Sequence, residues 1–212
     1  MVRNSMVLLE IGREYVEIAG IKWATMNVGA KKPTDFGHYF QWGDVRRYKD
    51  EQVGSSKKLF NWESYKFAED SDRSFTKYNG SDNKRVLDPI DDPVTMCWGD
   101  GWRLPTMEEF VALGNATNSR WTTNYKRSGV AGLVLTDKTD KSNELFFPAC
   151  GRCSDGSVDG MGLDGSYWSS SLHSIYVQRT YRLYFYCHNV IWQHNGYRCR
   201  GYSVRGVLGE KT

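Results

Sequence analysis

The cysteines are the residues of this chain best suited to redox or metal chemistry. Segment 150–153 reads Cys-Gly-Arg-Cys, a spacing found in thioredoxin-like redox centres and in halves of zinc sites. A redox centre of that kind opens a helix, whereas Pro148 precedes this motif and a glycine-rich segment follows it. Zinc needs a second ligand pair, and the gaps to Cys187-His188 and Cys199 match no common zinc module. The pattern favours incidental cysteines, with no metal and no cofactor.

Other arrangements that could support catalysis are missing from the sequence. It contains no HExxH motif, no GxSxG elbow and no Walker-type phosphate loop. The acidic pairs Asp91-Asp92 and Glu108-Glu109 are adjacent in sequence, so neither pair places two carboxylates across a cleft. We therefore expect a turn and a first helical turn at these positions, and no enzymatic activity.

The segment 173–200 is rich in side chains suited to binding. Residues 181–207 contain Tyr, His, Arg, Cys and Asn but no Lys, Asp or Glu. Strand alternation predicts that Leu183 and Phe185 point inward while Arg182, Tyr184 and Tyr186 point outward. Exposed Tyr and Arg resemble an antibody paratope, in which rigid rings provide contact area at low entropic cost. An ordinary sheet with aromatic cross-strand pairs has the same composition, so the pattern alone leaves both interpretations open.

Charge distribution narrows the choice of partners. Residues 165–209 contain five Arg and no acid, and because the whole chain carries +3, the remainder carries −2. We expect a cationic patch on a mildly acidic body. The net charge is too small to indicate a nucleic-acid partner. No apolar run approaches the about 18 residues of a transmembrane helix, so we expect no membrane insertion.

The elements that must position the segment 173–200 can be outlined from periodicity and turn residues. We expect a single α+β domain over 1–212, with an N-terminal extension at 1–16 and a long, irregular surface insertion at 45–85. A capping box at Thr106 and Glu109 predicts a helix over about 106–115, ended by Gly114 and Asn115. Strands are expected on either side of Gly20, in the aromatic stretch 35–44, in a hairpin at 129–151, at the end of a glycine-rich loop at 154–171, at 181–186, at 190–194 and at 201–207.

The cysteine count and the first residues bear on the cellular compartment. Five Cys are an odd number, so we expect no obligatory disulfide. Glu10 and Arg13 interrupt the first apolar stretch too early for a signal peptide. We expect either synthesis without a leader or a leader that this sequence does not include.

Four stretches resemble a known family. They are "IKWATMNVGAKKPTDFGHYFQWGD", "GDGWRLPTMEEFVAL", "LFFPACGRCSDGSVDGMGLDGSYWSSSL" and "GYSVRGV". Together they resemble the Fibrobacter succinogenes major paralogous domain, a branch of the C-type lectin fold, over roughly residues 17–207. The resemblance implies a C-type lectin-like fold with antiparallel strands, few helices and long loops. The chain departs from the family's "PAAGYR"-like pattern at Cys150, Arg152 and Cys153.

The resemblance also implies a function. Members of this family are often the variable proteins of diversity-generating retroelements, in which an error-prone reverse transcriptase rewrites adenines in a C-terminal cassette, here about 166–207. AAC codons rewritten in this way cannot give Lys, Glu, Gln, Met or Trp. The outward residues obey this limit except Gln178 and Gln193, and exposed Ile175, Ile191, Cys187 and Cys199 are then expected as random draws. The missing Asp is not explained. The tail has no acid, so we expect no calcium-dependent sugar binding there.

The expected function is a hypervariable, non-enzymatic protein that binds an unknown protein or glycan on a target cell, from a phage tail tip or a bacterial cell surface. Trp168, Leu183, Phe185, Val190 and Trp192 would hold the binding surface in place. The residues expected to contact the ligand are His173, Ile175, Tyr176, Val177, Arg179, Arg182, Tyr184, Tyr186, His188, Ile191, Gln193, His194, Asn195, Tyr197 and Arg200. Oligomeric display would add avidity.

Two alternatives remain open at this point. One is an undiversified surface adhesion protein of the same fold. The other is an enzyme related to formylglycine-generating proteins, for which Cys150/Cys153 or Cys187/Cys199 would be the reactive pair.

Overall fold

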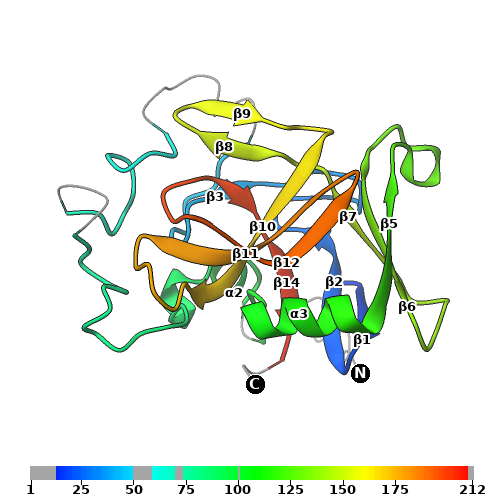
Figure 1. The fold of residues 1–212 in the computed structure, drawn as a ribbon, viewed down its shortest axis with the longest axis horizontal. Coiled ribbons are helices and arrows are strands. Elements are labelled where there is room, and N and C mark those ends of the chain that lie inside the picture. The colour runs from blue at the N-terminus through cyan, green and yellow to red at the C-terminus, as the bar shows by residue number, and fades with distance from the viewer. Residues whose placement is uncertain (1–12, 50–58, 70–73, 100, 210–212) are drawn as a thin grey trace, which may run out of the picture.

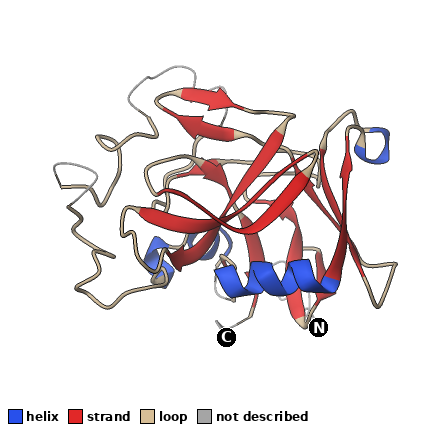
Figure 2. Cartoon of the chain, viewed as in Figure 1, coloured by secondary structure: helices blue, strands red, loops and turns tan. Residues whose placement is uncertain are grey.

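The structure, a computed structural model, describes residues 13–49, 59–69, 74–99 and 101–209. Most of the expected N-terminal extension therefore lies outside the described residues, and its last two residues already belong to a strand. The described chain consists mainly of antiparallel strands with few helices, which confirms the α+β class (Figures 1 and 2). No helix within the described ranges is long and apolar enough to cross a membrane.

The strands of the described residues form four sheets. The first has the order β1-β2-β14-β4, with β1 at Tyr15–Ile18, β2 at Ile21–Asn27, β14 at Arg205–Leu208 and β4 at Trp102–Arg103. The second has the order β12-β11-β10-β13-β3, with β12 at Asn189–Tyr197, β11 at Arg179–Tyr186, β10 at Asp164–Leu172, β13 at Tyr202–Ser203 and β3 at Tyr39–Phe40. The third contains β5 at Thr117–Thr122, β6 at Gly132–Asp137 and β7 at Glu144–Pro148, and the fourth is the hairpin of β8 at Arg152–Ser154 and β9 at Ser157–Asp159.

The predicted strands form, but β4, β5 and the β8–β9 hairpin were not predicted. Strands flank Gly20, and the hairpins β6–β7 and β11–β12 form where alternation placed them. The glycine-rich loop was expected to begin at 154, but residues 154–159 take part in the β8–β9 hairpin, because a turn at 155–156, in which both residues have positive φ, brings two three-residue strands together.

The main helix, α3, spans Met107–Ala116 and begins at the predicted capping box. The Thr106 hydroxyl accepts a hydrogen bond from the Glu109 amide at 3.2 Å, and the Glu109 carboxylate accepts one from the Thr106 amide at 2.8 Å. The same carboxylate pairs with both Nη atoms of buried Arg103 at 2.7 and 2.6 Å. Shorter helices occupy Pro93–Trp98 (α2), Pro89–Asp91 (η1) and Tyr125–Arg127 (η2).

The expected end of α3 at Gly114 is wrong, because this glycine has a packing role. A Cβ atom at Gly114 would lie 2.5–2.8 Å from three ring atoms of Trp192 in β12. The missing side chain allows the indole to lie directly against the helix. In Figure 1, α3 runs beside the β11–β12 hairpin. Gly114 therefore lets the helix support that hairpin.

The segment 59–85 differs from the expected surface insertion. It has no helix or named strand within its described residues, as predicted. However, it buries the rings of Phe60, Tyr65, Phe67, Phe75 and Tyr78, four of which join the second hydrophobic cluster around Trp42 and Trp168. Each buried ring removes a large apolar area from water, so this segment completes the core.

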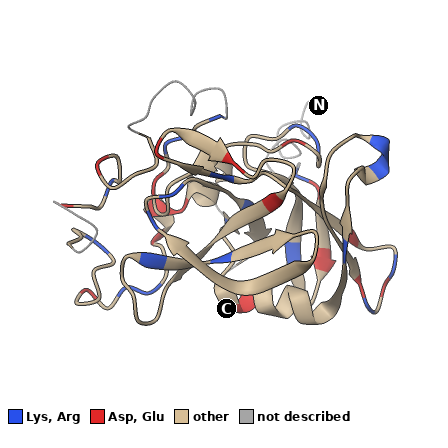
Figure 3. Cartoon of the chain, turned by 45° about the horizontal axis from the view of Figure 1, so that its top comes forward, with Lys and Arg blue, Asp and Glu red and all other residues tan. Residues whose placement is uncertain are grey.

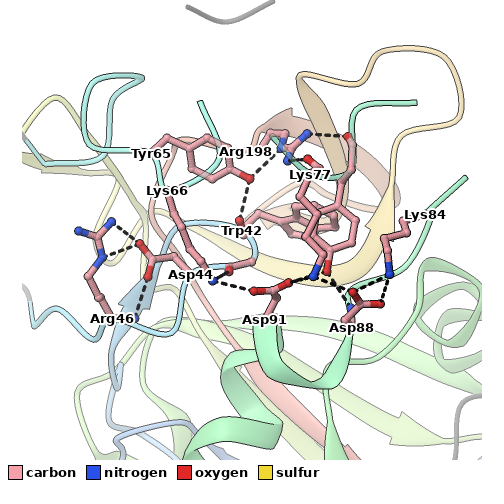
Figure 4. A network of polar contacts seen from close by, with 12 residues as sticks. Trp42, Asp44, Arg46, Tyr65, Lys66, Lys77, Lys84, Asp88, Asp91 and Arg198 are labelled. Carbon is pink, nitrogen blue, oxygen red and sulfur yellow. Dashed lines mark hydrogen bonds and ion pairs between the residues drawn. The ribbon is translucent and has the colours of Figure 1, made fainter. Parts of the chain in front are cut away.

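Buried Asp91 fixes the same segment to the body of the protein (Figure 4). Its carboxylate pairs with Lys66 at 2.6 Å, accepts a hydrogen bond from Tyr78 at 2.8 Å and also pairs with Lys77. A turn was predicted at Asp91-Asp92, but Asp91 ends the 3-10 helix η1, Asp92 caps α2, and both are buried. These contacts hold an irregular segment in one position without secondary structure.

Candidate ligand-binding face

The β11–β12 hairpin has the inward and outward faces that alternation predicts. Leu183 and Phe185 are completely buried. Gly165 of β10 makes room for the Phe185 ring, because a Cβ atom there would lie 2.2 Å from it. Val190 and Trp192 of β12 pack against the hydrophobic cluster that contains Leu183 and Phe185. The outward face therefore rests on a packed support.

A β-bulge in β12 changes which residues of this strand point outward. Arg182 pairs with His194, but Tyr184 pairs with Ile191, so three steps on β12 match two on β11. Simple alternation from inward Trp192 would point His194 inward as well. The extra residue returns His194 to the outward face, where its ring centroid lies 5.2 Å from that of Tyr184.

Aromatic side chains line the outward face of the hairpin. Tyr184 lies 5.9 Å from Tyr186, and Tyr186 lies 6.2 Å from His188, between ring centroids. With His194 they form the aromatic row, as we call these four residues. Tyr186 and His188 are exposed and the other two are half-buried. Rings held by one another present contact area without losing much entropy on binding.

The loop 173–178 adjoins this face and is organised by His173. Its Nδ1 accepts hydrogen bonds from the amides of Ile175 and Tyr176, both at 3.1 Å, and its ring stacks on Tyr181 at 4.8 Å. Burial and then nearby Arg179 lower the pKa of His173, which favours the neutral form that these bonds need. His173 thus shapes the loop, while Ile175 and Tyr176 at its tip are 74% and 52% exposed.

Arg198 holds this loop to the 59–85 segment from below. It is completely buried, and its guanidinium donates to the Tyr65 hydroxyl at 2.7 Å and to three main-chain carbonyls, those of Lys77, Tyr78 and Val177, at 2.9–3.0 Å (Figure 4). Val177 was predicted to contact ligand, but its side chain packs on the second hydrophobic cluster. Val177 therefore anchors the loop to the core.

The cationic patch differs in membership from the prediction. Arg198 and Arg205 are both fully buried, and the guanidinium of Arg205 donates to Asn27 and to two carbonyls. Burial lowers the pKa of Arg205 to about 10, so it stays charged at neutral pH but is not available to a ligand. β11 carries Arg179 and Arg182, β12 carries no Lys or Arg, and neither strand contains an acidic residue (Figure 3).

The other three arginines of the expected patch, Arg179, Arg182 and Arg200, line a pocket of about 330 Å³. We call it the arginine pocket; the residues that matter below are Arg152, Arg179, Arg182, Arg200, Tyr197 and Tyr202. Arg182, predicted to point outward, is only 6% exposed and forms part of the pocket wall. Its guanidinium is covered by the rings of Tyr184 and Tyr202, with 4.8 and 4.6 Å from Cζ to the ring centroids.

Sequence reasoning missed Arg152 and Tyr202 as members of this pocket. Arg152 lies in the CxxC segment, which we considered only for its cysteines. No sequence signal could have identified Arg152, because the β-bridge between Cys153 and Gly201 that brings its strand to the tail joins residues far apart in the chain.

The five cysteines all lie in the described part of the chain and form no disulfide there. Cys150 is buried, and burial raises the pKa of its thiol to about 11. Cys187 is exposed at the hairpin turn, but Cys199, expected outside, is buried in the second cluster. The nine residues of β12 separate these two by roughly 26 Å.

The remaining predicted residues lie on or beside the outward face. Gln193 is exposed, and the half-buried members are Arg179, Ile191, Asn195, Tyr197 and Arg200. Arg179 donates to Asn195 at 2.7 Å and to Tyr197 at 3.1 Å, which ties the two strands together. No group of three or more His, Cys, Asp or Glu that could hold a metal occurs in the described part of the chain. No protein-family model, curated protein or solved structure matches the chain.

Proposed function

We propose that the chain is a non-enzymatic ligand-binding protein of C-type lectin-like fold, diversified by a retroelement across the surface formed by residues 173–200. The ligand is a protein or glycan on a target cell, and the protein acts from a phage tail tip or a bacterial cell surface. Aromatic contacts and arginine hydrogen bonds supply the affinity. Display of several copies would strengthen a weak single site by avidity.

One observation carries the proposal: the exposed side chains of this surface are not those that folding would select. Ile175 is 74% exposed, and Cys187 is an exposed free thiol. Neither contributes apolar burial to the fold, and a free thiol on a surface invites oxidation. All the exposed residues in 173–200 except Gln193 belong to the set that rewritten AAC codons encode; they are Ser174, Ile175, Tyr176, Tyr186, Cys187, His188 and Asn189.

The supporting structure is consistent with a surface that varies while the fold stays fixed. Trp192 cannot arise from a rewritten AAC codon, and it is the residue that locks the hairpin on α3 through Gly114. Leu183 and Phe185 fill the core below. Substitutions at the exposed positions would change contacts with a ligand and leave these buried contacts unchanged.

The test is deep sequencing of this gene and its downstream flank from the source population. We expect substitutions concentrated in about 166–200, at positions where a nearby non-coding near-copy has adenine. Scaffold positions such as Trp168 and Phe185 are the internal control and should stay constant. Variation spread evenly over the chain, with no template repeat, would refute diversification and favour an undiversified adhesion protein.

The cysteine geometry supports the non-enzymatic part of the proposal. An oxidase-like mechanism needs a thiolate within reach of a second sulfur. Cys150 is buried with a raised thiol pKa, and Cys187 lies at the far end of β12 from Cys199. If Cys150→Ser or Cys187→Ser abolished an activity while leaving ligand binding intact, the enzyme alternative would replace this proposal.

A further inference from the structure

The arginine pocket gathers positive charge from separate parts of the chain. Arg152 comes from β8, Arg179 and Arg182 from β11, and Arg200 from the turn after β12. None of the pocket-lining residues is Asp or Glu. Within the described residues only Arg200 has an ion pair, with exposed Asp155 at 2.8 Å. Four guanidinium groups and one carboxylate therefore leave three positive charges outside any ion pair of the described chain.

Two buried side chains on the wall of this pocket keep polar atoms without a partner. Arg182 is 6% exposed and Tyr202 is 3% exposed. The Arg182 guanidinium donates through Nε to the Asn195 carbonyl at 3.2 Å and through Nη1 to the Ser166 hydroxyl, which leaves Nη2 without an acceptor among the described residues. The Tyr202 hydroxyl has no hydrogen-bond partner in that part of the chain either. Burial of unpaired polar groups is destabilising, so two of them on one pocket indicate a ligand that pairs with both.

The Tyr202 hydroxyl is held in place as a donor. A Cβ atom at Gly196, which also lines the pocket, would lie 2.6 Å from the Tyr202 oxygen, so the glycine leaves room for this hydroxyl. The Tyr202 ring packs against the Trp168 ring, with 4.1 Å between centroids, and against the Arg182 guanidinium, with 4.6 Å from Cζ to the ring centroid. Burial raises the pKa of Tyr202, so its hydroxyl stays protonated at neutral pH and can donate.

The neighbouring ionisable groups do not cancel the charge of the pocket. Asp164 forms no ion pair with Arg152 or Arg182, and burial raises the pKa of its carboxyl group, which weakens it as a counter-ion. His194 lines the pocket, and burial and then Arg182 lower its pKa, so it is mainly neutral at pH 7 and adds no positive charge. The guanidinium groups therefore dominate the electrostatics of the pocket.

We infer that the arginine pocket binds a phosphomonoester, which names the ligand class of the proposed binding face and rests on that proposed function. The free donors belong to several residues, because Arg179 already uses both Nη atoms on Asn195 and Tyr197 and Arg182 has one Nη left. A carboxylate has two oxygens and one charge, which suit a single guanidinium fork. A phosphate group has three terminal oxygens and a charge of about −1.5 to −2 at pH 7. Phosphate therefore matches both the scattered donors and the unneutralised charge better than a carboxylate does.

The experiment measures binding of small probes to the full chain by isothermal titration calorimetry at pH 7.5, where a phosphomonoester with a second pKa of about 6 is mainly a dianion. Glucose 6-phosphate, glucose 6-sulfate and glucuronic acid have the same sugar ring and differ in the anionic group at one carbon. We expect the phosphate to bind at least about ten-fold more tightly than glucuronic acid, because one further charge-assisted hydrogen bond is worth that factor. The sulfate has three terminal oxygens but a single charge, so it should bind with intermediate affinity.

A second phosphate probe identifies the carrier of the group. O-phosphoserine has the phosphate of glucose 6-phosphate on an amino acid, and serine and glucose are the uncharged-side-chain controls. Both phosphates should bind more tightly than their controls, and the tighter of the two assigns the phosphate to a sugar or to a peptide. Binding of both should weaken as salt is raised.

Two variants and a control separate ligand binding from folding. Tyr202→Phe keeps the ring and removes a hydroxyl that has no partner among the described residues, so the free energy of unfolding should not fall, whereas glucose 6-phosphate should bind about ten-fold more weakly. A purely structural role of Tyr202 would not produce this split. Arg152→Gln changes an exposed residue and should also weaken binding about ten-fold. Arg127→Gln alters an exposed arginine of η2 and should leave binding unchanged.

The outcomes distinguish this inference from the function on which it rests. Equal binding of glucose 6-phosphate and glucuronic acid, no binding of the phosphate at concentrations on the order of 10 mM, or unchanged binding in Tyr202→Phe or Arg152→Gln would overturn the inference. Tighter binding of glucuronic acid would replace the phosphate by a carboxylate. Diversification is judged independently by the sequencing experiment, so either result can fail while the other stands.

Discussion

Replacing Arg198 with methionine should destabilise the whole domain, although no carboxylate pairs with this arginine in the described structure. The substitution keeps an unbranched side chain but removes hydrogen bonds to the Tyr65 hydroxyl and to the carbonyls of Lys77, Tyr78 and Val177. It also removes guanidinium contacts with three rings, the closest of which is Phe75 at 4.3 Å from Cζ to the ring centroid.

The magnitude follows from two opposing effects. Each buried acceptor left without a donor costs about 1–3 kcal/mol, and four acceptors lose their donor at once. Removing a buried charge returns several kcal/mol, and water can reach the half-buried carbonyl groups at 77 and 177. We expect a net loss of about 3 kcal/mol in the free energy of unfolding, or about 6–12 °C in Tm for a domain of this size.

Urea denaturation followed by tryptophan fluorescence measures this loss, and Arg200→Met is the matched control. Arg200 lies two residues further along, and its ion pair joins side chains that are 31% and 64% exposed. Exposed pairs contribute at most about 1 kcal/mol, so the control should remain close to the parent protein. If Arg198→Met unfolds within 0.5 kcal/mol (about the scatter between surface variants) of the parent, the carbonyl network does not outweigh the cost of burying the charge, and the reasoning is refuted.

Three further predictions concern the support of the binding face and its pH dependence. Gly114→Ala should destabilise the domain by about 1–2 kcal/mol, because overpacking against Trp192 outweighs a helix-propensity gain of about 1 kcal/mol; urea denaturation should show recovery in the double variant with Trp192→Phe, and a stabilised single variant would contradict this. The lowered pKa of His173 means that the unfolded loop binds a proton more readily, so loop order is present above about pH 6.5 and is lost as pH falls below it. Hydrogen exchange of the two loop amides should quicken at pH 5, after correction for intrinsic rates, but not in His173→Asn, whose side-chain oxygen can still accept; equal pH dependence in both proteins would exclude this role. Burial raises the pKa of Asp91, but hydrogen bonds from Lys66, Lys77 and Tyr78 outweigh burial, so the pKa lies below its usual value. Its stabilisation is therefore present above about pH 4 and lost as pH falls further, so thermal melts of Asp91→Asn should show a lower Tm at pH 7 and a smaller drop between pH 5 and 3, whereas parallel pH curves would contradict the assignment.

Local patterns predicted the parts of the fold that depend on neighbouring residues. The capping box at Thr106 and Glu109 and the alternation in β11 each involve residues a few positions apart. Physical chemistry within such a window leaves one favourable arrangement, and the structure adopts it.

The buried arginines and the irregular core segment could not be predicted in this way. A guanidinium is expected at the surface unless acceptors satisfy it, and those of Arg198 come from residues 65–78 and 177. The segment 59–85 is too polar on average to indicate a core element, yet its rings pack on Trp42 and Trp168. The candidate site was predicted as a face, but the pocket within it needed the non-local approach of Arg152.

The β-bulge in β12 has a consequence for how copies of this protein behave beside one another. β12 is the outermost strand of its sheet and contains the apolar run Val190, Ile191 and Trp192. A straight edge of this kind is a template onto which a second copy can add its own edge strand, which leads to aggregation. The bulge interrupts the regular spacing of main-chain donors and acceptors along that edge and bends the strand. The bulge therefore disfavours edge-to-edge pairing between copies of this chain that come close to one another.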